Sequence, residues 1–109
     1  MNTELPYYYE TDVVWKEGRV SVLSAPGLPE ITVAPPPEFK GVDGVWTPEH
    51  LYIASINVCF IATVIGISAN SNFEYESLNS NATAKLEKVE GKGLIITEAV
   101  LKGIASLKF

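Results

Sequence analysis

Residues 47–69 of this chain read TPEHLYIASINVCFIATVIGISA and are apolar almost throughout. The first two favour a helix start, because the hydroxyl of Thr47 can accept an unpaired backbone N–H and Pro48 needs no donor at the first helical position. The polar residues 70–72 mark its end. We therefore expect one long helix from Pro48 to about Ala69.

The apolar run inside this helix covers residues 51–67. It is shorter than the roughly 20 residues that a bilayer core requires. Ser55, Asn57 and Thr63 also interrupt it. We therefore expect a helix buried on most sides within protein, and no membrane partner.

Segments rich in β-branched and aromatic residues precede the helix. We expect three short antiparallel strands there, within residues 7–15, 20–22 and 31–33, and ordinary strand packing for the three tyrosines at 7–9. Residues 34–46 contain three consecutive prolines, which cannot donate ladder hydrogen bonds, so we expect a loop or crossover.

Two long strands are expected after the helix, over residues 73–88 and 94–108. A turn at 90–93 would join them, and residues 78–81 suggest a bulge or break in the first. Strands, one helix and further strands in this order predict an α+β fold, with an antiparallel sheet around the central helix.

Composition limits the class of protein. The chain has 109 residues, which suits a single domain over 1–109, and a net charge of −5, which disfavours nucleic acid as a partner. Its one cysteine, Cys59, cannot form an internal disulfide, and residues 1–6 do not resemble a signal peptide. We therefore expect a cytoplasmic protein.

The predicted helix is apolar nearly all round, and one sheet face covers only one side of a helix. Something else must cover the remaining sides. We expect the same helix from a second chain to do so, in a homodimer.

Three residues are candidates for chemistry. Cys59 lies mid-helix, where a free cysteine is most often buried and inert unless a nearby cation favours its thiolate. Arg19, the only arginine, follows Gly18 in a predicted turn, where an arginine is most often a solvated surface residue. Glu49, in the first helical turn, is stabilised there by the helix dipole without any function. His50 has no second His or Cys at ligand spacing, so we expect no metal and no cofactor.

Residues 37–41 (PEFKG), 44–51 (GVWTPEHL) and 54–60 (ASINVCF) together resemble the OsmC/Ohr family of osmotically induced and organic hydroperoxide resistance proteins. The most specific element is the Thr-Pro-Glu-x-Leu helix start with a cysteine ten residues after the glutamate. The likeness extends over residues 14–101. It implies an intertwined homodimer of α+β subunits with a peroxidatic cysteine on the central helix.

By the same resemblance, Cys59 matches the peroxidatic position, Arg19 the arginine that activates it, and Glu49 the glutamate that holds this arginine. The thiolate would attack an organic hydroperoxide or hydrogen peroxide and become a sulfenic acid. Family members carry a second, resolving cysteine and continue with a further helix and strand, whereas this chain has one cysteine and ends at Phe109. We therefore expect an external thiol to act as the reductant.

Ten residues of straight helix separate the backbones of Glu49 and Cys59 by about 15 Å. One chain can hardly bring both into one site, so we expect two composite sites per dimer, each taking its glutamate from the partner. The apolar residues expected either to line a peroxide pocket or to serve as core are Trp46, Tyr52, Ile56 and Phe60.

Three functions stay open at this point. The first is a thiol-dependent peroxidase that uses a single cysteine. The second is a non-catalytic OsmC-like binding or assembly module in which Cys59 is a buried structural residue. The third is a thiol sensor that forms a mixed disulfide. The fold and the homodimer are common to all three.

Overall fold

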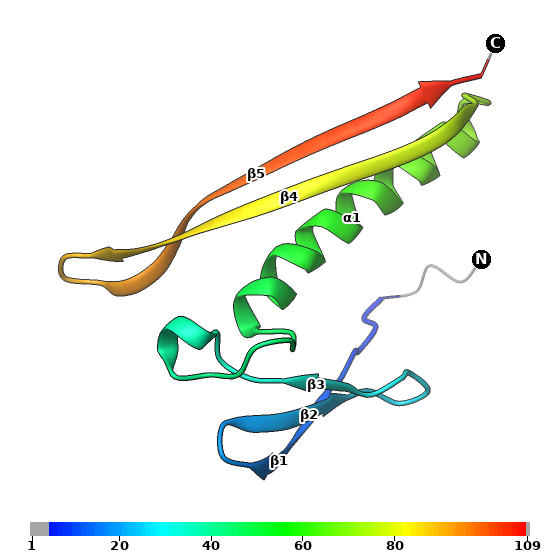
Figure 1. The fold of residues 1–109 in the computed structure, drawn as a ribbon. Coiled ribbons are helices and arrows are strands. Elements are labelled where there is room, and N and C mark those ends of the chain that lie inside the picture. The colour runs from blue at the N-terminus through cyan, green and yellow to red at the C-terminus, as the bar shows by residue number, and fades with distance from the viewer. Residues whose placement is uncertain (1–4, 109) are drawn as a thin grey trace. The chain divides into compact units, whose positions relative to one another are not determined.

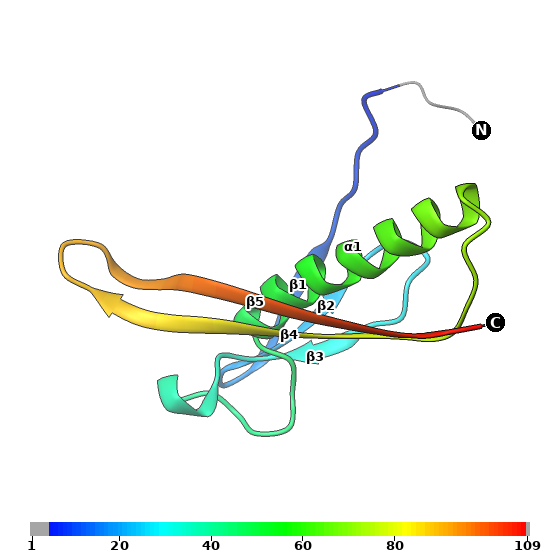
Figure 2. The same cartoon turned by 90° about the horizontal axis from the view of Figure 1, so that it is seen from above.

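The computed structural model describes residues 5–108 (Figures 1 and 2). Contacts within the chain group it into two compact units, one that ends at Pro48 and one that begins at Glu49. The elements are β1 (Asp12–Glu17), β2 (Val20–Ser24), β3 (Ile31–Val33), the short 3-10 helix η1 (Pro37–Phe39), α1 (Pro48–Asn70), β4 (Tyr75–Val89) and β5 (Gly93–Leu107). The predicted α+β class and the order of its elements are confirmed.

The first unit is a three-stranded antiparallel meander in the order β1-β2-β3. Its connecting segment forms η1 and then returns to the sheet, where Trp46 makes an isolated parallel bridge with Val33. The backbone N–H of Ala34 donates to the carbonyl of Trp46 at 3.1 Å. Thr47, which follows Trp46, is buried, and Pro48 is the first residue of α1.

The first strand starts later than predicted. β1 begins at Asp12, whose ladder partner Ser24 is the last residue of β2. Beyond Ser24 the chain turns at residues 26–27, so β2 does not continue alongside residues 7–11, which lie outside the strands. Tyr8 and Tyr9 are therefore 89% and 92% exposed, and the expected strand packing of these tyrosines is wrong within this chain.

The second unit consists of α1 and the long hairpin of β4 and β5. The helix lies along one face of the hairpin (Figures 1 and 2). It ends where Asn72 adopts a left-handed conformation, at φ 54°, and the N–H of Phe73 donates to the carbonyl of Ser68 at 3.0 Å. This is the Schellman arrangement, which satisfies carbonyls that the last helical turn leaves unpaired.

The hairpin is paired without a break over the residues where a bulge was predicted. Leu78–Asn81 pair in register with residues 102–105, so that prediction is wrong. Asn79 and Asn81 lie on the exposed face of β4, where side chains with low strand propensity need not pack. The register shifts instead between Tyr75 and Ser77 and between Lys85 and Leu86. The predicted turn at residues 90–93 is confirmed.

Among the described residues of the second unit, the hairpin covers α1 on one side only, so the expected burial on most sides is absent within that unit. Its 23 residues span about 34 Å, whereas each 15-residue strand spans about 50 Å, so the far end of the hairpin extends past the helix. Val58 is 67% exposed and Ile65 is 48% exposed. By length and composition alone α1 also meets the requirements of a membrane span, a test that the core helices of soluble proteins pass as well.

We predict different effects for two asparagines at the end of α1. Asn72→Ala should lower the free energy of unfolding by about 1 kcal/mol, because alanine tolerates the left-handed conformation poorly. Asn70→Ala, in the last helical turn, should leave it unchanged or raise it by a few tenths, because alanine is the better helix former. Denaturant unfolding measures both, and equal effects would contradict this account of the helix end.

A second prediction concerns the pKa of Glu87. The hydroxyl of Thr97 donates to its Oε2 at 2.5 Å, and Lys85 Nζ lies 3.2 Å from Oε1. The hydrogen bond from Thr97, followed by that from Lys85, lowers the pKa of this carboxyl below its ordinary value. Thr97→Val should therefore raise the pKa of Glu87, as followed by NMR titration.

The sign of the accompanying stability effect follows from the direction of that shift. A carboxyl whose pKa is lowered in the folded state contributes stability above its ordinary pKa, and loses it as the pH falls through the folded value. The wild type should therefore exceed Thr97→Val in stability near neutral pH, and the difference should vanish in acid. Thr83→Val, on the same hairpin, is the control and should leave the pKa of Glu87 unchanged.

Candidate functional site

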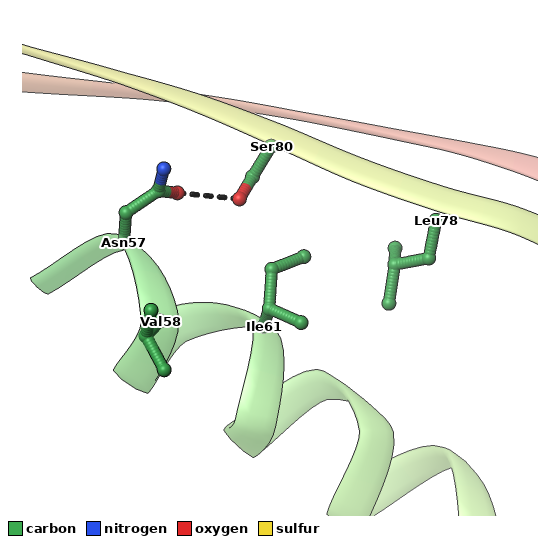
Figure 3. Close-up of a pocket in the computed structure, with 5 residues that line it drawn as sticks. All are labelled: Asn57, Val58, Ile61, Leu78 and Ser80. Atoms are coloured by element: carbon green, nitrogen blue, oxygen red, sulfur yellow. Dashed lines mark hydrogen bonds between the residues drawn. The ribbon is translucent and has the colours of Figure 1, made fainter. Parts of the chain in front are cut away.

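Cys59 lies at the middle of α1 on the face turned away from the hairpin. Asn57 and Ile61 face β4 (Figure 3), and each is two residues from Cys59, which places the cysteine about 160° from both around the helix axis. The thiol is free and exposed in this chain. The burial expected for a structural cysteine is therefore absent within the single chain that the structure describes.

The polar neighbours of Cys59 are already engaged. Ser55 and Thr63 lie one turn to either side, and their hydroxyls donate to the backbone carbonyls of Tyr52 at 2.7 Å and of Cys59 at 2.8 Å. Neither hydroxyl proton is available to stabilise a thiolate. Since α1 contains no Lys or Arg, a cation for this thiol must come from another element.

Glu49 occupies the first turn of α1 beside a pocket of about 240 Å³. The pocket lies between the helix start and β4, and it is lined by Glu49, His50, Ile53, Ala82, Thr83 and Ala84. One carboxylate oxygen, Oε1, is buried and has no hydrogen-bond partner among residues 5–108. A buried unpaired carboxylate oxygen is costly, so this position favours a donor brought from elsewhere.

The three predicted site residues are divided between the two units. Glu49 and Cys59 are on one continuous helix, about 15 Å apart along the axis and about 80° apart around it, so the chain does not bring them together. Arg19 is exposed in the turn between β1 and β2. There Gly18 has a positive φ of 53° and its carbonyl accepts a hydrogen bond from Trp15 Nε1 at 3.0 Å. The predicted turn is confirmed, and Arg19 belongs to the other unit from Glu49 and Cys59.

Two contacts between α1 and the hairpin are absent from the sequence-based expectations. Ser80 Oγ donates to Asn57 Oδ1 beside an open pocket of about 240 Å³ (Figure 3). The ring of Phe60 lies against Gly103 of β5 and so turns toward the hairpin, away from the face that carries Cys59. A glycine inside a predicted strand was the available signal, because such a residue often marks a close approach of another group.

Within residues 5–108 no three His, Cys, Asp or Glu side chains gather as they would around a metal ion. On the outer face of the helix, Tyr52 is 53% exposed and shares with Ile56 the side on which the thiol lies. The chemistry that this face offers is that of an accessible sulfur with apolar neighbours.

No protein-family model and no curated protein matches this chain. Solved structures do match it. An OsmC-like protein of unknown function from Vibrio cholerae is similar with a TM-score of 0.87 and 19% identity, over 95% of this chain and 77% of that one. An organic hydroperoxide resistance protein OsmC from Legionella pneumophila is similar with a TM-score of 0.76 and 20% identity, over 94% of this chain and 73% of that one.

An organic hydroperoxide resistance protein from Elizabethkingia anophelis is also similar, with a TM-score of 0.74 and 19% identity, over 93% of this chain and 71% of that one. At these identities the likeness establishes the fold. The chain has the fold of OsmC-like and Ohr proteins, as the motif around residues 44–60 predicted.

Proposed function

We propose that this chain, which has the fold of organic hydroperoxide resistance proteins, is a thiol-dependent peroxidase that reduces organic hydroperoxides or hydrogen peroxide through Cys59. The observation that carries the proposal is the position of the only sulfur nucleophile of the chain. It is a free, exposed thiol at the centre of the helix, on the face that the hairpin leaves uncovered. The thiol is open to a small peroxide in the single chain, and in the proposed homodimer it would lie beside the second copy, where Arg19 could reach it.

The proposed step begins with attack of the Cys59 thiolate on one peroxide oxygen. An S–O bond forms and the O–O bond breaks, so sulfur loses two electrons and the peroxide gains them. The products are a sulfenic acid and an alkoxide, which takes a proton and leaves as the alcohol, or as water from hydrogen peroxide. An external thiol then condenses with the sulfenic acid and releases water. A second thiol reduces the mixed disulfide and restores Cys59.

The thiolate needs a cation, and we assign this role to Arg19. Its guanidinium can donate to a carboxylate and face a thiolate at the same time, because it carries five N–H donors in a planar fork. Glu49 would hold it through the oxygen that has no partner among the described residues. Such a pair leaves both groups hydrogen-bonded.

A homodimer is part of the proposal. Glu49 and Cys59 of one chain are about 15 Å apart on the same helix, so one arginine cannot contact both within a single chain. With two copies, Arg19 can lie between the cysteine of one chain and the glutamate of the other. A reducing compartment such as the cytoplasm would supply the external thiol.

We predict that peroxide consumption depends on Cys59 and Arg19. Purified protein should consume cumene hydroperoxide or hydrogen peroxide in the presence of dithiothreitol, and Cys59→Ser should abolish the activity. Arg19→Ala should slow the reaction by roughly 30-fold at pH 7, because an unassisted thiol is only a few per cent thiolate there. Lys16→Ala removes a cation from β1 and should have no effect.

The alternative is a non-catalytic OsmC-like binding or assembly module. It would be supported if the wild type consumed peroxide no faster than Cys59→Ser, and if alkylation of Cys59 began only near pH 8.5, where an ordinary thiol ionises. A thiol sensor would give a stable mixed disulfide without sustained turnover.

We further predict an energetic coupling between Arg19 and Glu49. Either Arg19→Ala or Glu49→Gln should lower the free energy of unfolding by about 1–2 kcal/mol, because each removes one partner of a charge-assisted hydrogen bond. The double variant should cost little more than one single variant, which denaturant unfolding at fixed protein concentration would measure. Lys16→Ala combined with Glu49→Gln is the control and should be additive. Additive effects of Arg19→Ala and Glu49→Gln would show that the two side chains do not pair.

A further inference from the structure

The ring of Phe60 occupies the space above Gly103. A Cβ atom at position 103 would lie 2.9 Å from Phe60 Cε2, closer than real Cβ atoms come to a neighbour, and 3.1 Å from Cζ, which is tighter than most such contacts. Only a residue without a side chain allows the ring to lie there. A glycine inside a strand weakens that strand. The close approach of the ring explains why a glycine nevertheless stands at this position.

A second contact holds the helix at the same rung of the hairpin. Gly103 pairs with Ser80 in the β4–β5 ladder, and Ser80 Oγ donates to Asn57 Oδ1. Asn57 and Phe60 are three residues apart, so they lie on neighbouring positions of one helix face. One rung of the hairpin therefore holds two adjacent points of α1, one through a hydrogen bond and one through a ring.

Two such contacts restrict both the rotation of α1 about its axis and its sliding along the strands of the hairpin. Cys59 lies between the two contact residues in sequence and is directed about 160° from Asn57 and about 100° from Phe60. Its direction is set by the backbone, because Cβ of a helical residue has one orientation relative to the axis. The rotation of α1 thus determines where the thiol lies.

We propose that Gly103 and Phe60 are positioning residues for Cys59: the ring seated on the glycine fixes the rotation of α1 that presents the thiol on the outer face. This inference rests on the proposed function in assigning a role to the thiol. The seat itself is a feature of the second unit alone, which contains all of these residues.

The test adds a side chain at position 103 and then makes room for it by shortening the side chain at position 60. Gly103→Val adds three carbon atoms to an extended strand that favours valine, so the strand itself should tolerate it. The ring must then shift, and under the proposal the helix turns with it. We expect the rate constant for oxidation of Cys59 by cumene hydroperoxide to fall about tenfold, since a displacement near 1 Å can cost up to 100-fold.

The matched rescue is Phe60→Leu, which removes three heavy atoms from the facing side chain. Phe60→Leu/Gly103→Val should return to within about twofold of the wild type, because the valine fills the space that the ring leaves. Phe60→Leu alone should slow the oxidation about threefold, because no ring then rests on the glycine. Gly66→Ala is the control on the same helix, because a Cβ there meets nothing within 4 Å. Gly103→Ala, with a single added methyl group, should reduce the rate about threefold and serves if the valine variant does not fold.

Alkylation of Cys59 by iodoacetamide is measured on the same proteins, with circular dichroism to show that each is folded. If the wild type consumes no peroxide, the proposed function fails, and the positioning proposal is still judged by alkylation. A slower rate in Gly103→Val that recovers in the double variant supports it. Equal rates in Gly103→Val and wild type, or a loss that Phe60→Leu does not restore, would overturn it.

Discussion

The central helix is apolar on nearly all sides, and a two-stranded hairpin covers one of them. Of the apolar residues among 5–108 only Ala34 and Pro36 are buried, while Val58 and Ile65 on α1 remain 67% and 48% exposed. Complete burial of such a side chain contributes about 1.5–3 kcal/mol. The stability of this fold therefore depends on what covers the outer faces of α1, and the proposed homodimer would cover them with a second copy.

The hairpin face beneath the helix explains why so little is buried within one chain. Ser80, Ala82 and Ala84 of β4 lie next to α1, and Gly103 of β5 seats a ring from it. Small residues let a helix approach closely, but they bury little area themselves. The remaining volume of the core must then come from the large side chains of α1, and several of these, such as Val58 and Ile65, remain exposed. The small residues of the hairpin therefore explain both the close contact on one face of α1 and the exposed apolar side chains on its other faces.

Much of the fold could be predicted because its signals are local. Pro48 begins the helix, and the turns at Gly18 and at residues 90–93 follow from the conformations that glycine permits. The late start of β1 depends on where its partner β2 ends. The positions of the register shifts in the hairpin depend on which residues pair across the two strands. The pattern of one strand alone therefore could not predict either feature. The positions of Glu49 and Cys59 on one helix followed from their spacing. The packing of the Phe60 ring against Gly103 could not be predicted in this way, because the two residues are far apart in the chain.

Two groups on α1, the Cys59 thiol and Glu49 Oε1, each lack a partner among the described residues, and this restricts the chemistry of the site. Cys59 needs a cation and its hydroxyl neighbours donate to backbone carbonyls, while Glu49 Oε1 needs a donor that no described residue provides. A single guanidinium can satisfy both groups, and Arg19 is the only arginine. Because about 15 Å of helix separates the two groups, the arginine can do so only where the cysteine of one chain meets the glutamate of another. Under the proposed arrangement, separating the two copies removes the cation and the donor in one step, so reactivity and stability would be lost together.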